Sequence, residues 1–153
     1  MTSTDNPGIR VPPPLIYAGL TGIGVLAHAN LASGLLLFVG AAGGLLGLAL
    51  IVGSLDRFRR AKVRPEPWQP AARLIIAGLY RYSRNPMYLG MTVFALGIAG
   101  TLASAPAAIG ASAAALLVDR LVIRREEDYL LRTFGQAYAD YCRAVPRWLG
   151  RLN

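Results

Sequence analysis

The sequence predicts an all-α membrane protein with four transmembrane helices and a cytoplasmic helical extension at its C-terminal end. Of the 153 residues, 54% are hydrophobic and only 16% are charged. Residues 11–55 contain no Asp, Glu, Lys or Arg, and neither do residues 85–118. One span needs about 20 apolar residues, so each uncharged stretch is long enough for a pair of spans. This pattern excludes a disordered chain, a disulfide-stapled secreted module and an ordinary soluble enzyme.

The uncharged stretches divide into two helical hairpins, and a long polar connection separates them. Pro14 suits the first turn of a helix, where a missing N–H is tolerated. A stripe at every fourth position from Glu126 to Tyr138 predicts that the last helix continues beyond the membrane. We expect a flexible lead-in at 1–13 and a single domain at 14–153, with helices at about 14–27, 32–55, 87–102 and 107–141 and a cytoplasmic connection at 56–86.

The first apolar run also resembles a secretory signal peptide. Leu15–Leu26 is followed by Ala27-His28-Ala29, which has the small-x-small form of a cleavage site. Against this interpretation, Asp5 and Arg10 both precede the run, and prolines stand directly before it. We therefore expect a retained first helix.

The second predicted helix contains glycines at helical spacing. Gly40 and Gly44 form one small-xxx-small pair, and Gly43 and Gly47 form another. Such pairs let two helix backbones approach closely in lipid. The neighbour could belong to the same chain or to a second copy, so a homo-oligomer is possible.

The charge distribution predicts the orientation. The net charge is +8, and apart from Arg10 in the lead-in the basic residues flank the hydrophobic spans in three groups: residues 57–64, residues 73–84 and residues 120–151. None lies between the two helices of either predicted hairpin. The positive-inside rule therefore places both termini and the connection in the cytoplasm, at the inner membrane if the source is bacterial. Because this rule explains the charge, we expect no nucleic-acid partner.

Two cytoplasmic segments carry the residues that are capable of chemistry. Residues 78–90 lead into the third predicted helix, and residues 124–147 follow the fourth. Arginines and tyrosines alone would be typical of contact with lipid headgroups. Here carboxylates and amides are interleaved with them, along with Gly and Pro, which favours a pocket for a zwitterionic ligand.

These two segments resemble the C-terminal core of the isoprenylcysteine carboxyl methyltransferase and phospholipid methyltransferase family. The motif is Leu74–Gly90 followed by Glu126-Glu127, Phe134-Gly135, Tyr138 and Tyr141, and the resemblance covers residues 65–150. It implies an integral-membrane enzyme that transfers methyl from S-adenosylmethionine to a lipophilic acceptor, either a carboxylate, a thiol or an amine. It further implies that the cofactor is surrounded by Leu74, Ile75, Tyr80, Asn85, Pro86, Met87, Tyr88 and Glu126. We add Arg84 to these cofactor-binding candidates because of its charge. Its guanidinium can hold the carboxylate of the ligand while Glu126 pairs with the ammonium of the ligand.

The sequence departs from the family pattern at two positions. Asn85 stands where the family usually has histidine, so no ionisable imidazole is present there, although the amide still donates and accepts hydrogen bonds. Val122 stands where the eukaryotic carboxyl methyltransferases have an arginine that helps to hold the acceptor. Arg120 or Arg124 could substitute for it, although neither is in register with Val122. Glu126 and Arg124 are the candidate catalytic residues.

Two other function classes remain open at this point. One is a nicotinamide-dependent membrane reductase with a similar C-terminal architecture, and the other is a non-catalytic membrane scaffold. A metal site made of His and Cys is not expected, because the chain contains one residue of each type, His28 and Cys142. The expected partners are membrane lipids and a lipophilic substrate.

Overall fold

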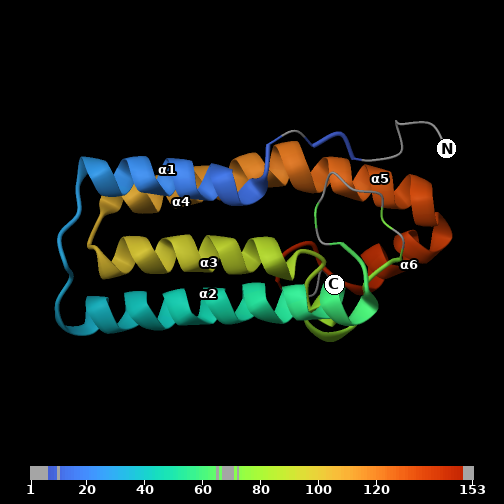
Figure 1. Ribbon diagram of the computed structural model, residues 1–153, viewed down its shortest axis with the longest axis horizontal. Coiled ribbons are helices and arrows are strands. Elements are labelled where there is room, and N and C mark those ends of the chain that lie inside the picture. The colour runs from blue at the N-terminus through green and yellow to red at the C-terminus, as the bar shows by residue number, and fades with distance from the viewer. Residues whose placement is uncertain (1–6, 10, 65, 67–70, 72, 150–153) are drawn as a thin grey trace.

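The computed structural model describes residues 7–9, 11–64, 66, 71 and 73–149, and all regular secondary structure in them is helical. Four long helices lie side by side, and the shorter segments cap one end of the bundle (Figure 1). The elements are α1 (Pro13–Ala27), α2 (Gly34–Ala61), the 3₁₀-helix η1 (Gly78–Arg81), α3 (Pro86–Thr101), α4 (Ala105–Val118), the π-helix η2 (Asp119–Ile123), α5 (Arg124–Phe134) and α6 (Gln136–Ala144). The all-α fold class is thus confirmed.

The helix starts follow from the local sequence. Proline occupies the first turns of α1, α3 and α4, where its missing N–H leaves no helical hydrogen bond unmade. At the start of α4 the Ser104 hydroxyl also accepts a hydrogen bond from the Ala107 N–H at 3.2 Å. The turn after α1 is tied to the end of α3, since the N–H groups of Asn30 and Ala32 each donate to a carbonyl there at 2.9 Å.

The glycines of α2 pack against α3 of the same chain. A Cβ on Gly47 would lie 2.3 Å from the Phe94 nitrogen, and one on Gly40 would lie 2.4 Å from the Thr101 nitrogen. From the opposite side, a Cβ on Gly97 would lie 2.3 Å from the Gly44 nitrogen. The glycines therefore allow backbone contact within one chain, which answers the question that the sequence left open for this face.

The outward face of α2 is apolar and exposed. Phe38 is 71% exposed, and Leu45 is 70% exposed. By contrast, the buried face of α4 consists mainly of small residues, and Ala107, Ala111 and Ala114 have no exposed surface. This arrangement, with apolar side chains outside and small ones inside, is typical of helices packed in lipid.

Two helical runs are long and apolar enough to cross a membrane by length and composition. They are α2 and the continuous run of α4, η2 and α5 from Ala105 to Phe134. The uncharged part of the second run ends at Val118, since Asp119 and Arg120 follow it, and the five residues after Ile123 are all charged. The other two long helices, α1 and α3, are apolar but have only 15 and 16 residues. The structure therefore establishes two candidate spans rather than the four that the sequence predicted.

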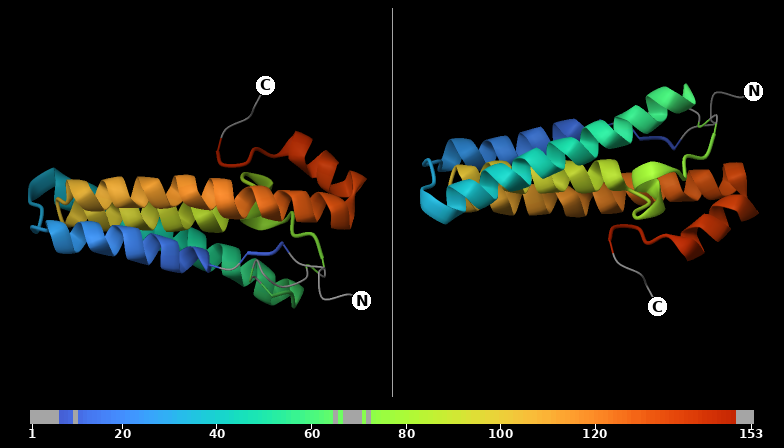
Figure 2. Two further views of the ribbon diagram at one scale, coloured as in Figure 1. Left: turned by 90° about the horizontal axis from the view of Figure 1, so that it is seen from above. Right: turned by 90° about the horizontal axis from the view of Figure 1, so that it is seen from below.

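The ends of two predicted helices differ from the expectation. The second helix continues to Ala61 instead of ending near residue 55, and Lys62 caps it in the left-handed conformation with φ of 54°. The helix expected at 107–141 is broken at Gly135, whose φ of 53° is incompatible with a continuing helix. Beyond Gly135 the chain turns back toward the bundle as α6 (Figure 2).

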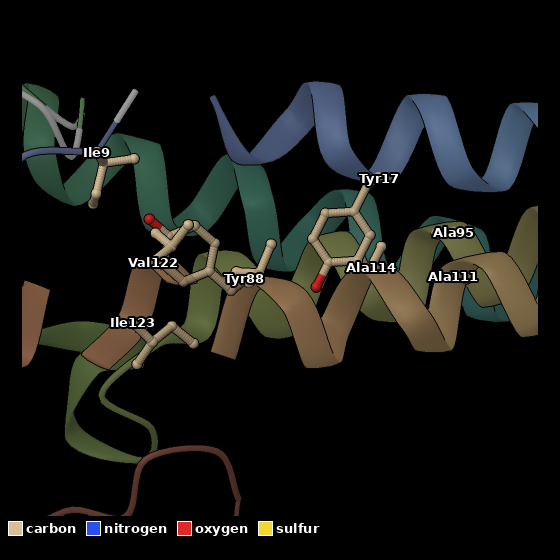
Figure 3. Packing of buried hydrophobic residues seen from close by; sticks show 9 residues of the cluster. Ile9, Tyr17, Tyr88, Ala95, Ala111, Ala114, Val122 and Ile123 are labelled. Atoms are coloured by element: carbon tan, nitrogen blue, oxygen red, sulfur yellow. The ribbon is translucent and has the colours of Figure 1, made fainter. Parts of the chain in front are cut away.

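The N-terminal lead-in lies partly outside the described residues, namely at residues 1–6 and 10. Within the described part, Ile9 is only 6% exposed and packs with Tyr88, Val122 and Ile123 (Figure 3). This part of the lead-in therefore belongs to the core, although we expected the whole of it to be flexible.

Candidate functional site

A polar cavity lies at the end of the bundle where α2, η1, α3, α5 and α6 approach one another. Eight of the nine residues that the sequence assigned to the cofactor line it: Leu74, Ile75, Tyr80, Arg84, Asn85, Met87, Tyr88 and Glu126. Residues separated by some 50 positions in the chain are thus brought into one site. Their convergence satisfies the central geometric requirement of the sequence-based interpretation.

The pair formed by Tyr88 and Glu126 stands at the centre of this site. Tyr88 lies in the first turn of α3 and is 4% exposed, and its hydroxyl donates to Glu126 Oε1 at 3.0 Å. Burial raises the pKa of Glu126 to about 8, the hydrogen bond from Tyr88 lowers it, and the nearby Glu127 charge raises it. A carboxyl group with such a pKa is mostly protonated at neutral pH and becomes ionised when a cation is placed beside it.

A network of charged residues stabilises another side of the polar cavity. Glu127 accepts from Arg84 Nη1 at 3.1 Å and from Arg147 Nη2 at 2.5 Å. The Asn85 side chain donates to the Arg147 carbonyl at 3.1 Å, so it fixes the tail beneath the loop before α3. Arg84 Nε is buried and has no hydrogen-bond partner among the described residues. The guanidinium therefore keeps one donor that a ligand could satisfy.

Tyr80 forms a further part of the wall. Its backbone carbonyl accepts from the Tyr141 hydroxyl at 2.6 Å, which connects η1 to α6. Its ring lies edge-on to Phe58 of α2, with 5.8 Å between the centroids. Burial, followed by the charge of Glu126, raises the pKa of Tyr80, so the hydroxyl remains a neutral hydrogen-bonding group.

The π-helix η2 sets the direction in which α5 presents its carboxylates. One wide turn at Asp119–Ile123 shifts the register between α4 and α5, and such turns often occur at functional sites. Val122 and Ile123 within it are buried in the core, and Asp119 accepts from Trp148 Nε1 at 3.1 Å. The sequence contains no breaker there, so this element could not be predicted from it.

Two predicted site residues do not line the cavity. Pro86 is fully buried at the start of α3, where it fixes the direction of the helix that carries Tyr88. Arg124 is exposed and lines neither this cavity nor the groove described next. Sequence reasoning missed Phe58 and Glu66 as lining residues, because the sequence around them carries no recognisable motif.

An apolar groove of about 670 Å³ adjoins the polar cavity. Tyr17 and Thr21 of α1 line one side, Ile51 and Leu55 of α2 line the other, and α3 forms the floor. Its volume falls within the usual range for ligand sites, which is about 300–1,000 Å³. Three residues line both spaces, namely Glu66, Met87 and Tyr88. The polar cavity and the apolar groove therefore share one wall.

Comparisons with known proteins point to one family. A family model described as phospholipid methyltransferase matches residues 35–137. A protein-S-isoprenylcysteine O-methyltransferase from Dictyostelium discoideum is 35% identical over 77 residues, which cover 50% of this chain and 32% of that protein. Protein-S-isoprenylcysteine O-methyltransferase B from Arabidopsis thaliana is 34% identical over 84 residues, which cover 53% of this chain and 41% of that protein.

The matched segments thus span well under half the length of either relative. No solved structure matches the chain. Both relatives are named as methyltransferases, so the comparisons give no support to the reductase or to the non-catalytic scaffold.

Proposed function

The chain belongs to the phospholipid methyltransferase family, and on that premise we propose that it transfers methyl from S-adenosylmethionine to a lipophilic acceptor at the cytoplasmic membrane face. The observation that carries the proposal is the wall shared by the two spaces. Tyr88 belongs to this wall and donates to Glu126 at 3.0 Å. A polar donor on one side and an apolar acceptor on the other would meet there.

The residues of the polar cavity fit the donor. Glu126 offers a carboxyl group that ionises beside a cation, and Arg84 offers an unpaired buried N–H for a carboxylate. Leu74 and Ile75 are half-buried apolar side chains suited to a nucleobase face. Together these groups match a ligand in which an amino acid is joined to a nucleoside.

When bound, S-adenosylmethionine supplies a methyl group that its sulfonium makes electrophilic. The chain's own residues then need to orient the two reactants and exclude water, which are effects of proximity and orientation. The Tyr88 hydroxyl holds the Glu126 carboxyl in place, and Met87 lines both spaces beside it.

The polar cavity has a volume of about 120 Å³, less than a ligand of this size requires. Val63, Arg64, Ala71 and Arg73 form part of its wall and lie outside any helix. Widening the cavity by moving this wall would leave the helices unchanged. The proposal therefore includes an outward shift of the wall when the donor binds.

We further propose that α1 and α3 cross the membrane together with α2 and α4, so that residues 14–153 form one four-span domain with both termini in the cytoplasm. The turns between α1 and α2 and between α3 and α4 lie at the same end of the bundle (Figure 1). All Lys and Arg side chains of the described residues lie toward the opposite end or beyond it. The short α1 and α3 would be accommodated by local thinning of the bilayer.

Calorimetry on the detergent-purified full chain tests the proposal. S-adenosylmethionine should bind with a stoichiometry near one, while a nicotinamide dinucleotide should not bind. Absence of donor binding in every lipid and detergent condition would refute the methyltransferase assignment.

A further inference from the structure

We infer that Glu66 selects an acceptor with an ammonium head, so that the substrate of this chain is a long-chain primary amine rather than a carboxylate. The inference rests on the proposed function and specifies its acceptor. Glu66 is not part of the motif that suggested the family, and its role emerges only from its position in the structure.

Unpaired polar atoms are concentrated on the walls of the two spaces. Among the residues that the structure describes, three buried side-chain atoms have no hydrogen-bond partner: Thr21 Oγ1, Glu66 Oε2 and Arg84 Nε. Arg84 lines the polar cavity, Thr21 lines the apolar groove, and Glu66 lines both. Because buried polar groups are nearly always satisfied in native proteins, a ligand in these spaces could supply the missing partners.

The charge of the groove favours a cationic head. Glu66 is the single ionisable Asp, Glu, Lys, Arg or His side chain among the described residues that line it. A carboxylate head beside Glu66 would find no cation among the described residues that line the groove, because the arginines line the polar cavity instead, so its desolvation in the groove would be uncompensated. An ammonium head would pair with Glu66 and satisfy the buried Oε2 atom.

The shape of the groove fits one long aliphatic chain. Its lining on α1 runs from Pro13 to Val25, which is about 18 Å at 1.5 Å per residue. Met91, Phe94 and Ile98 line its floor along α3. The polar end with Glu66 adjoins Tyr88, so the head of the chain would lie at the wall shared with the polar cavity.

The chemistry balances with Glu66 as proton acceptor. Its carboxylate takes one proton from the ammonium, and the freed nitrogen lone pair forms the new N–C bond. The methyl–sulfur bond breaks at the same time, and its electron pair returns to sulfur. The product leaves as a protonated secondary amine, and the proton on Glu66 passes to water. No oxidant, reductant or metal is required.

The test compares hexadecylamine with hexadecanoate, which share one chain and differ in the charge of the head. We measure thermal unfolding of the full chain in neutral detergent with each compound, and transfer of labelled methyl to each. Hexadecylamine should raise the unfolding temperature and accept methyl, whereas hexadecanoate should do neither. Glu66→Gln should lower transfer to the amine at least tenfold, and Glu66→Lys should reverse the binding preference.

Asp140→Asn is the matched control, because Asp140 is an exposed carboxylate of α6 that lines neither space. Donor binding is measured on every variant by calorimetry. If the donor binds but hexadecanoate stabilises the protein as well as hexadecylamine does, the inference fails and the methyltransferase proposal stands. An unchanged response of Glu66→Gln to the amine also overturns it. If the donor does not bind to the unmodified chain, the proposed function itself fails.

Discussion

The Tyr88 hydroxyl and the Glu126 carboxyl, 38 positions apart in the sequence, are joined by a hydrogen bond of 3.0 Å. The bond connects the first turn of α3 to the first turn of α5, on the wall between a polar cavity and an apolar groove. It therefore couples the position of the carboxyl group to the helix that separates the two proposed reactants.

Removing the charge of Glu126 should weaken donor binding. A hydrogen bond to a charged group contributes about 1.5–3 kcal/mol, so Glu126→Gln should reduce the affinity for S-adenosylmethionine by about 10- to 100-fold. The amide retains the size of the side chain and can still accept from Tyr88. Calorimetry on the variant checks the value, with Asp140→Asn expected to bind like the unmodified chain. A Glu126→Gln variant of unchanged affinity would remove this residue from the cofactor site.

The stability of the protein should fall as the pH rises through the titration of Glu126. Its folded pKa of about 8 exceeds its ordinary value of 4.5, so between these values the folded state binds more protons than the unfolded state. This contribution to stability is complete below about pH 4.5 and is lost as the pH approaches 8. In thermal unfolding at pH 5.5 and pH 8.5, the unmodified chain should lose more stability than Glu126→Gln. Equal losses would show that Glu126 does not titrate in this range.

Removing the Tyr88 hydroxyl should raise the pH at which Glu126 titrates. The hydrogen bond from Tyr88 lowers the Glu126 pKa, so Tyr88→Phe should move the midpoint of the pH dependence above 8. Tyr17→Phe is the control, because Tyr17 also lines the groove but bonds to Thr92 instead of Glu126. A midpoint that moves equally in both variants would contradict the specific role of the Tyr88 hydroxyl.

Because α2 and α3 are in backbone contact, alanine substitutions at two nearby glycines of α2 should have different effects on the stability of the protein. A Cβ on Gly47 would lie 2.3 Å from the Phe94 nitrogen, whereas one on Gly44 would meet nothing within 4 Å. Gly47→Ala should therefore destabilise the protein by about 1–3 kcal/mol, the usual range for overpacking. Gly44→Ala should be neutral or stabilising by about 0.5–1 kcal/mol, since alanine favours helix over glycine. Chemical denaturation in detergent measures both, and equal effects would refute the close contact between these two helices.

Much of the fold and the site could be predicted from the sequence, because both follow from local patterns. The uncharged stretches predicted the two hairpins, and the proline at residue 14 lies within the first turn of α1 as expected. The family motif indicated the residues around Tyr88 and Glu126, which the fold brings together. Positions that depend on packing across the molecule could not be predicted in this way.

Three features illustrate that limit. The π-helix at Asp119–Ile123 arises where α4 passes into α5, and no residue type marks it. Glu66 lies eight positions before the motif, and no sequence pattern indicated that it would line both spaces. Arg124 was considered as a substitute for the arginine that the eukaryotic enzymes have at the position of Val122, but the helix turns it outward into an exposed position.

The most direct test of the central claim follows a labelled methyl group from S-adenosylmethionine into a total lipid extract, with the purified full chain in lipid. The account predicts that label enters the organic phase with the unmodified chain and with Asp140→Asn, and that Glu126→Gln reduces the transfer at least tenfold. Donor binding without any label in the organic phase, or undiminished transfer by Glu126→Gln, would contradict it.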